Sequence, residues 1–266
     1  MTLETQVRDL VAGRAGTWGV YARHLGTGEI VAINADVVMP AQSSLKTGIL
    51  VVFERRVDDG AIDPERRVPM RDDDRESGSG VLRYLGAGLE PTLNDLAWLM
   101  IIVSDNVATE MLMRELGGAA AIDAELDRLE LPTARTNDPL PGAFAHFRAS
   151  PRDLAELYTH LGPRSREILY RQQSLDFLAR RVPHDPGVAD YGLTPPVRFF
   201  GKAGWGGTEI VDAARFETAD AAWIVAAMGK DLPDLWHRAD FVGPRTLADI
   251  GDLLYRDWGG GAVEWH

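Results

Sequence analysis

Three short motifs carry the side chains most suited to chemistry, and the first is Ser43-Ser44-Leu45-Lys46. The pattern of residues 43–56 predicts a helix. Residues three apart share one face of a helix, so the Ser43 hydroxyl and the Lys46 amine are expected to touch. At the start of a helix, free backbone N–H groups and the positive end of the helix dipole favour a developing alkoxide. We therefore predict a nucleophilic serine at position 43 and a lysine base at position 46.

The other two motifs are Ser104-Asp105-Asn106 and Lys202-Ala203-Gly204, and two of the three lysines of the chain lie in the motifs. A lysine acts as a base only as the neutral amine, and burial or a second cation lowers its pKa toward that state. We predict that the side chains at 43, 46, 104, 106 and 202 converge on one pocket. The structural alternative is an ordinary helix start with a solvated lysine, followed by a cluster that only caps the next helix.

Hydrophobic periodicity predicts the elements that position these motifs. Helical spacing predicts helices over residues 3–12, 43–56, 93–103, 106–116 and 244–257. Alternating β-rich runs predict a hairpin of 17–23 with 30–33, and a meander of 198–202, 208–216 and 221–228. Ser150 is expected to cap a further helix, with Pro151 at its first position. Residues 131–149 read as an irregular loop rich in Pro and Gly, and a loop of this length is more often functional than accidental.

The order of these elements predicts an α+β fold. Both ends of the chain are α/β, whereas the middle is helical. We expect residues 1–38 together with 192–266 to form a discontinuous α/β subdomain, in which terminal helices flank an antiparallel sheet. Residues 39–191 would form an inserted all-α subdomain, with the active site in the cleft between the two.

Composition excludes several classes of function. The net charge of −12 disfavours nucleic acid and an anionic membrane surface as partners. No apolar run is long enough to span a bilayer. The six histidines lack ligand spacing, and no Gly-rich phosphate loop occurs, so we expect no metal and no cofactor. No secretory signal is visible, so the chain as written is expected to be cytoplasmic, or periplasmic or secreted if a signal peptide has been removed. The oligomeric state is left open.

The motifs and their order resemble the class A β-lactamases and the related penicillin-binding, transpeptidase-type serine hydrolases, which carry S-x-x-K, S-D-N and K-T-G elements in one cleft. The resemblance extends from roughly residue 15 to residue 255. Pro40-Ala41-Gln42 precedes the serine as a proline does in the family, and residues 150–154 resemble the segment after its omega loop. The helix–S-D-N–helix stretch is matched by "LNDLAWLMIIVSDNVATEMLMREL", residues 93–116.

By motif position, the resemblance implies a β-lactamase/transpeptidase-like fold and a role for each matching residue. Ser43 is implied to be the nucleophile and Lys46 its base, and Ser104 is implied to pass a proton to the leaving group. Asn106 would hydrogen-bond a substrate amide, and Lys202 would add positive potential to the cleft. The oxyanion hole would consist of the backbone N–H groups of Ser43 and Trp205. The substrate would be a small amide, ester or β-lactam.

Four positions depart from the family pattern. Ala203 lacks the hydroxyl that would bind a substrate carboxylate, and Glu209 stands where the family often has an arginine for that carboxylate. Residues 131–149 contain no Glu to activate the deacylating water, and Asp138 is the only carboxylate there. Glu110 replaces an asparagine that props up that loop, so Asp138 and Glu110 are the possible deacylation bases.

These departures predict intact acylation chemistry with altered deacylation and altered carboxylate recognition. The first hypothesis is therefore an esterase, amidase or acyl-transfer enzyme whose substrate lacks the usual carboxylate and could carry a cationic group near Glu209. The first alternative is a genuine class A-type β-lactamase with a rearranged general base. The second alternative is a non-catalytic binding protein or pseudoenzyme on the same fold.

Overall fold

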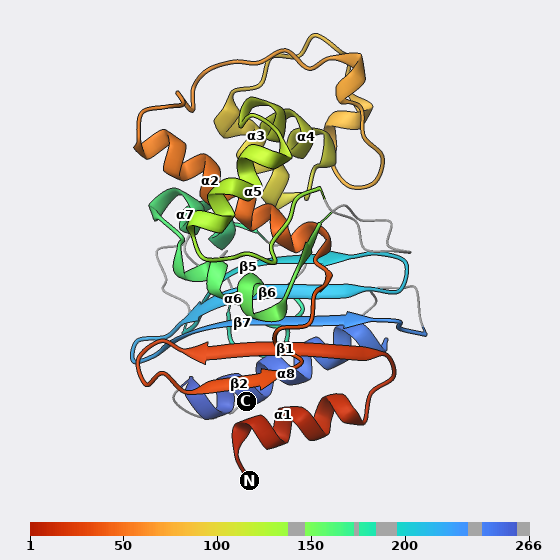
Figure 1. The fold of residues 1–266 in the computed structure, drawn as a ribbon, viewed down its shortest axis with the longest axis vertical. Helices are drawn as coiled ribbons and strands as arrows, with labels where there is room; N and C mark the ends of the chain where they lie inside the picture. Colours follow the sequence, from red (N-terminus) through yellow and green to blue (C-terminus); the bar gives the residue numbers. More distant parts are fainter. Residues whose placement is uncertain (138–146, 173–175, 185–195, 234–240, 260–266) are drawn as a thin grey trace.

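A five-stranded antiparallel sheet separates two layers of helices (Figure 1). The computed structural model describes residues 1–137, 147–172, 176–184, 196–233 and 241–259. The strands follow the order β2-β1-β7-β6-β5, with bounds β1 Thr17–His24, β2 Ile30–Ile33, β5 Arg198–Trp205, β6 Ile210–Glu217 and β7 Ala222–Lys230. Strand β5 is therefore an edge strand, and its end at Trp205 is one border of the site described below.

Both faces of the sheet are buried, which explains why β7 carries apolar residues at successive positions. Ile224 and Met228 belong to the core on one face, whereas Trp223 and Val225 belong to the core on the other. The same alternation along β5 sends Phe200 to one core and Phe199 to the other. The strands are thus held from two sides, and the edge of β5 has a fixed position.

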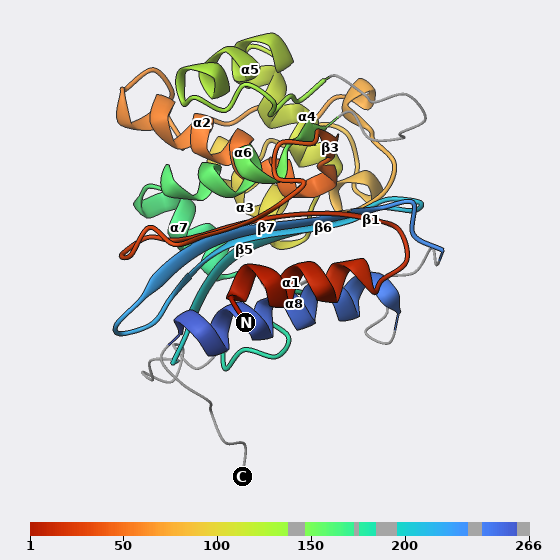
Figure 2. The same ribbon diagram turned by 60° about the horizontal axis from the view of Figure 1, so that its bottom comes forward.

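The two terminal helices cover one face of the sheet (Figure 2). Helix α1 (Leu3–Ala12) buries Leu3, Val7 and Val11, whose spacing of four residues makes one apolar stripe. Helix α8 (Val242–Trp258) packs beside it. Among the described residues, no helix has the length and apolar character needed to cross a membrane.

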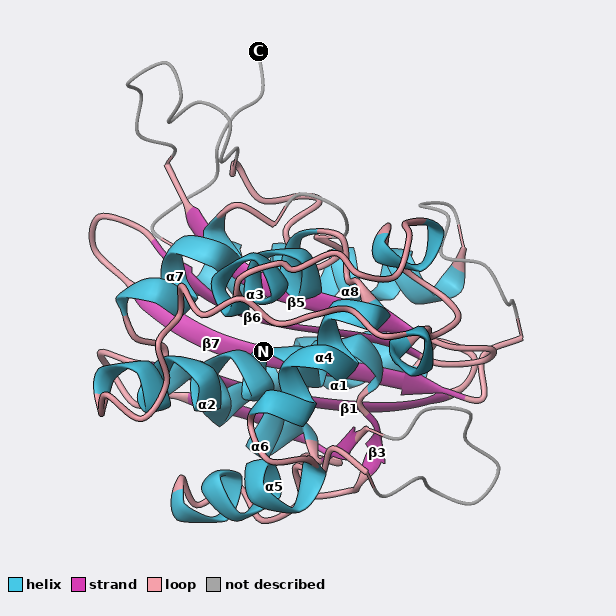
Figure 3. Ribbon diagram, turned by 90° about the horizontal axis from the view of Figure 1, so that it is seen from above, coloured by secondary structure: helices cyan, strands magenta, loops and turns pink. Residues whose placement is uncertain are grey.

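The remaining helices cover the other face of the sheet, as Figure 3 shows from above. Ser150 caps α6 as predicted, because its Oγ accepts a hydrogen bond of 3.1 Å from the N–H of Asp153. The α-helices of this layer are α2 Lys46–Asp58, α3 Leu93–Ile102, α4 Asn106–Glu115, α5 Ala119–Arg128, α6 Pro151–Glu156 and α7 Pro163–Tyr170. Short 3-10 turns are η1 Gln42–Leu45, η2 Asp72–Asp74, η3 Leu82–Tyr84 and η4 Leu157–Thr159, and β3 Met39–Pro40 pairs with β4 Arg148–Ala149.

The predicted α+β fold, with its antiparallel sheet and terminal helices, is confirmed. Two details differ from the sequence-based expectation. Ser43 lies in the 3-10 turn η1, and the α-helix begins only at Lys46. Helices α5 and α7 had not been predicted. The division into residues 1–38 plus 192–266 and residues 39–191 stays a prediction, since its second boundary lies outside the described residues.

Candidate active site

A cleft of about 700 Å³ brings together residues from η1, α2, α4 and the end of β5. Among the residues singled out from the sequence, the following line it: Ser43, Lys46, Asn106, Glu110 and Trp205. The cleft wall on the side of the 76–78 loop includes Ser77 and Gly78. Elements far apart in the sequence thus meet at the serine that was predicted to be the nucleophile.

The turn that carries Ser43 is fixed against the edge of β5. The Ser44 hydroxyl donates to the backbone O of Lys202 at 2.5 Å. An ideal Cβ placed on Gly204 would lie 2.5 Å from the backbone N of Ser43 and 2.9 Å from that of Ser44. Only a glycine lets the strand come this close, which gives the third position of the Lys-Ala-Gly motif a steric explanation.

Two residues beside the site have left-handed backbone conformations that non-glycine residues rarely adopt. Gln42 has φ 49° and Ser104 has φ 54°. Such conformations cost about 1–3 kcal/mol each and persist where the surrounding structure holds them. Here the conformations lie directly before the predicted nucleophile and at the start of the Ser-Asp-Asn motif.

The Lys46 amine is the centre of the polar network. Its Nζ donates to Ser104 O and to Asn106 Oδ1, both at 2.7 Å, and lies 3.2 Å from Ser104 Oγ. Burial lowers the pKa of Lys46 well below its usual value, and the charge of Lys202 lowers it further, against the opposing charges of Asp105 and Glu110. A neutral amine has two N–H donors for the two short bonds, which leaves its lone pair for a hydroxyl.

The Ser-Asp-Asn motif ties α4 to the cleft wall. Asn106 donates from Nδ2 to Ser77 O at 2.7 Å, so the second N–H of its amide remains to meet a substrate carbonyl. The carboxylate of Asp105 is fully buried and accepts from the backbone N–H groups of Val81 and Leu82 at 2.6 and 2.9 Å. Ser104 is 3% exposed, so its hydroxyl meets Lys46 below the cleft surface.

Lys202 was predicted to add positive potential to the cleft, and this stays a prediction. It is fully buried, its Nζ donates to Ala203 O at 2.7 Å, and it is not among the residues that line the cleft. Burial lowers its pKa to about 8, against the opposing charge of Asp212. Its charge reaches the site through its effect on the pKa of Lys46.

Asp212 is the buried partner that the sequence motifs did not indicate. It lies on β6, opposite Ala203, and burial raises its pKa to about 8. One carboxyl oxygen accepts from Leu178 N at 2.9 Å, whereas Oδ1 has no hydrogen-bond partner among the described residues. No motif marks this residue, because its relation to Lys202 arises only from strand pairing.

The remaining predicted residues have mixed positions. Glu110 lines the cleft and acts on the pKa of Lys46. Glu209 lies one loop beyond Trp205, next to Gly206, which does line the cleft. Asp138 lies outside the described residues. Within the part of the chain that the structure describes, no three His, Cys, Asp or Glu side chains gather in a way that could hold a metal ion.

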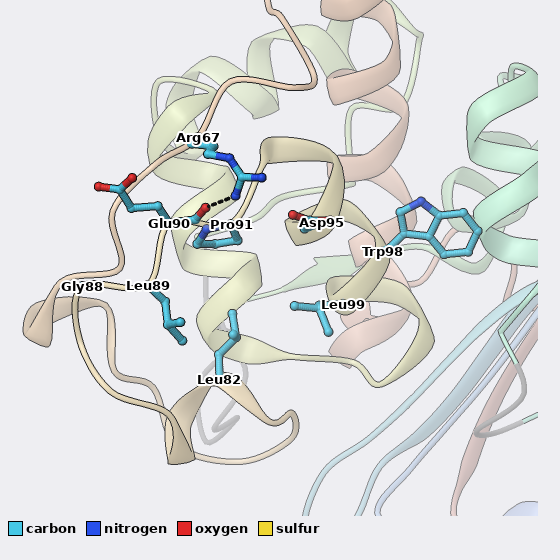
Figure 4. Close-up of a pocket in the computed structure, with 9 residues that line it drawn as sticks. All are labelled: Arg67, Leu82, Gly88, Leu89, Glu90, Pro91, Asp95, Trp98 and Leu99. Atoms are coloured by element: carbon cyan, nitrogen blue, oxygen red, sulfur yellow. Dashed lines mark hydrogen bonds between the residues drawn. The ribbon is translucent and has the colours of Figure 1, made fainter.

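A second depression, of about 810 Å³, shares none of the residues that line the cleft (Figure 4). Its walls include apolar side chains such as Leu89, Trp98 and Leu99. Its polar groups serve local structure: Arg67 donates to Glu90 O at 2.7 Å, and Asp95 caps the start of α3. The chemistry-bearing motifs therefore point to the first cleft.

Comparison with known proteins agrees with this arrangement of motifs. A model of the beta-lactamase enzyme family matches residues 2–258. The chain belongs to this family. Curated relatives of this beta-lactamase-family protein include a beta-lactamase of Streptomyces albus G, 29% identical over 184 residues, and one of Streptomyces lavendulae, 31% identical over 185 residues. Each alignment covers 62% of this chain, and 58% and 59% of the respective relative.

Solved structures match nearly the whole beta-lactamase-family chain. A structure of PBP-A is 29% identical with a TM-score of 0.82, and covers 96% of this chain and 95% of its own. A beta-lactamase from Sphaerobacter thermophilus is 26% identical with a TM-score of 0.80, and covers 96% of both chains. The fold and the family thus agree, whereas the activity is argued below from the site.

Proposed function

We propose that this protein is an active-site serine hydrolase that forms an acyl-enzyme on Ser43 with an amide, ester or β-lactam carbonyl. The observation that carries the proposal is the buried Lys46 amine, whose pKa is lowered and which lies in the same cleft as Ser43. In the neutral form, Lys46 takes the Ser43 proton, directly or through the Ser104 hydroxyl 3.2 Å away. The Ser104 hydroxyl then returns a proton to the leaving group.

Charge stabilisation at the carbonyl would come from backbone N–H groups. The close approach of Gly204 to the backbone N of Ser43 brings the end of β5 beside η1. The N–H groups of Ser43 and Trp205 would then form the oxyanion hole, and such donors are worth about 10²–10³ in rate each. Asn106 offers its second amide N–H to the substrate.

Deacylation is proposed to be slow toward penicillins, and carboxylate recognition to be altered. Residues 131–149 contain no Glu, Ala203 has no hydroxyl, and Glu209 would repel a substrate carboxylate. Two proteins to which the chain is similar have names that refer to β-lactams. KPC of Klebsiella oxytoca is a carbapenem-hydrolyzing beta-lactamase, and a PBP-A variant was solved as an acyl-enzyme with penicillin G. β-Lactams are therefore suitable probes.

A second candidate is a β-lactamase with a rearranged general base, and Glu110 favours it. Its side chain lines the cleft with Ser43 and its charge acts on the pKa of Lys46. A carboxylate in that position could activate the water that releases the acyl group. In that case Glu110→Gln would lengthen the lifetime of the acyl-enzyme, whereas in the first proposal it would leave that lifetime unchanged.

Two measurements test the proposal. A fluorophosphonate probe should label the wild type and not Ser43→Ala, while Ser77→Ala, which removes another hydroxyl from the cleft, should still be labelled. Intact-mass spectrometry after mixing with benzylpenicillin should then show a long-lived adduct. Absence of labelling would support the non-catalytic binding protein, and rapid turnover of penicillin would refute slow deacylation in favour of the second candidate.

A further inference from the structure

The side chain of Gln42 has the features of a ligand-binding group that the proposed chemistry does not use. It is 8% exposed, yet it lines the cleft next to Ser43. Its backbone is held in a left-handed conformation at φ 49°. No hydrogen bond to its amide occurs among the described residues. The amide of Gln42 is therefore left to hydrogen-bond with water or with a ligand in the cleft.

The carboxylate of Glu209 lies close to the side chain of Gln42. An ideal Cβ on Gly206 would lie 2.4 Å from Glu209 Oε2 and 2.5 Å from Gln42 Nε2, so the two side chains meet at one point of the cleft-lining backbone. The carboxylate is oriented from within its own loop, where Thr208 donates from N and Oγ1 at 3.2 and 3.3 Å. Among the described residues, Glu209 takes part in no ion pair.

The charges around the cleft favour a cation. Glu76 and Glu110 also line it. Among the described residues that line the cleft, Arg114 pairs with Asp74 and Glu115, and burial lowers the pKa of Lys46. The Glu209 carboxylate attracts a cationic ligand and repels an anionic one.

We propose that Gln42 and Glu209 form a subsite beside Ser43 that binds a cationic group of the substrate, of the quaternary or primary ammonium class. This inference rests on the proposed function for its link to catalysis, but the binding itself does not require a reactive serine. The carboxylate of Glu209 attracts the cation, and the Gln42 side chain, whose Nε2 lies at the same point beside Gly206, borders the subsite. The subsite thereby replaces carboxylate recognition with recognition of the opposite charge.

Binding is measured first, on the full chain with Ser43→Ala so that no chemistry intervenes. Choline and its uncharged isostere 3,3-dimethylbutan-1-ol are compared by ligand-observed NMR. We expect choline to bind about 5- to 10-fold more tightly than its isostere, because two or three partly exposed carboxylates attract its charge by that amount. Added salt should reduce this preference for choline. Glu209→Gln in the same background should reduce the preference 2- to 5-fold, and Glu209→Arg should invert it.

Turnover is measured second, with matched thioesters. Acetylthiocholine and S-(3,3-dimethylbutyl) thioacetate differ only by a charge in the leaving group. Phenyl thioesters of 4-(trimethylammonio)butanoic and 5,5-dimethylhexanoic acids carry the same difference in the acyl group. Thiol release is read with a disulfide reagent, because the chain has no cysteine to interfere. In at least one of these pairs, the charged thioester should have a higher kcat/KM than its neutral isostere. Both Glu209→Gln and Gln42→Met should lower this charged-to-neutral ratio of kcat/KM.

Control variants separate the outcomes. Glu65→Gln removes an exposed carboxylate that does not line the cleft, and it should change neither ratio. A wild-type melting temperature for Glu209→Gln would show that the variant is folded. Equal binding of choline and its isostere overturns the subsite whether or not Ser43 reacts. Charge-selective binding without labelling supports the subsite and overturns the proposed chemistry.

Discussion

Gly204→Ala adds one methyl group between the edge strand and the turn that carries Ser43. The new Cβ would lie 2.5 Å from Ser43 N, 2.7 Å from Gln42 Cβ and 2.9 Å from Ser44 N. Ordinary contact begins near 3.4 Å, so η1 and β5 must separate by about 1 Å. Two of the three contacts are backbone atoms, so no side-chain rotation relieves them. Gly204 does not have a positive φ, and the expected effect is therefore purely steric.

The magnitude follows from two separate costs. Overpacking of this kind destabilises a fold by about 1–3 kcal/mol, which for a chain of this length lowers Tm by roughly 2–4 °C per kcal/mol. Displacing a reacting group by about 1 Å costs about 10²-fold in rate. Gly204→Ala should therefore remain folded and label with a fluorophosphonate about 100-fold more slowly than the wild type.

The assay compares pseudo-first-order labelling rates and thermal unfolding of three proteins. Gly207→Ala is the matched control, because a Cβ at Gly207 meets nothing within 4 Å and the residue lies in the next loop. It should retain the rate and the Tm of the wild type. If Gly204→Ala also labels at the wild-type rate, the contact between β5 and η1 does not position Ser43, and the account of the site is wrong.

Three further predictions follow from buried polar groups. Lys46→Arg replaces the amine with a guanidinium that stays protonated and cannot act as a base, so fluorophosphonate labelling should be lost. In the wild type, the labelling rate should rise with pH and reach a plateau below pH 10.5, because the pKa of Lys46 lies below this usual lysine value. Asp105→Ala leaves the N–H groups of Val81 and Leu82 without an acceptor and should cost about 3 kcal/mol in urea unfolding, with Asp105→Asn costing less. Asp212 has its pKa raised to about 8, from 3.8, so the folded state holds its proton where the unfolded state has lost it. Stability of the wild type relative to Asp212→Asn should therefore fall as pH rises from about 4 to 8 and be constant outside that window; equal slopes for the two proteins between pH 5 and 8 would contradict the shift.

Local sequence patterns predicted the elements that local physics determines. The spacing of Leu3, Val7 and Val11 predicted the first helix, and α1 buries these residues. Ser150 was predicted as a cap, and its hydroxyl accepts the expected bond from Asp153. In both cases the determining groups lie within four residues of one another, so the sequence alone contains the necessary information.

Features that depend on contacts between distant segments were predicted poorly. The pattern of residues 43–56 predicts an α-helix that includes Ser43, but Ser43 lies in a 3-10 turn that begins with the left-handed Gln42 and that Gly204 approaches closely. The burial of Lys202 near Asp212 arises from the pairing of β5 with β6, which no local pattern indicates. Gln42 was missed because a single glutamine carries no periodic or motif signal. Tertiary packing, not local preference, decides these positions.

The most direct test of the account is the identity of the modified residue. After reaction with a fluorophosphonate, the protein is digested and the labelled peptide is sequenced by tandem mass spectrometry. The account predicts that the adduct lies on Ser43, and that Ser44, whose hydroxyl donates to Lys202 O, carries none. An adduct on Ser44 or Ser104, or a modified protein in which Ser43 is unlabelled, would contradict it.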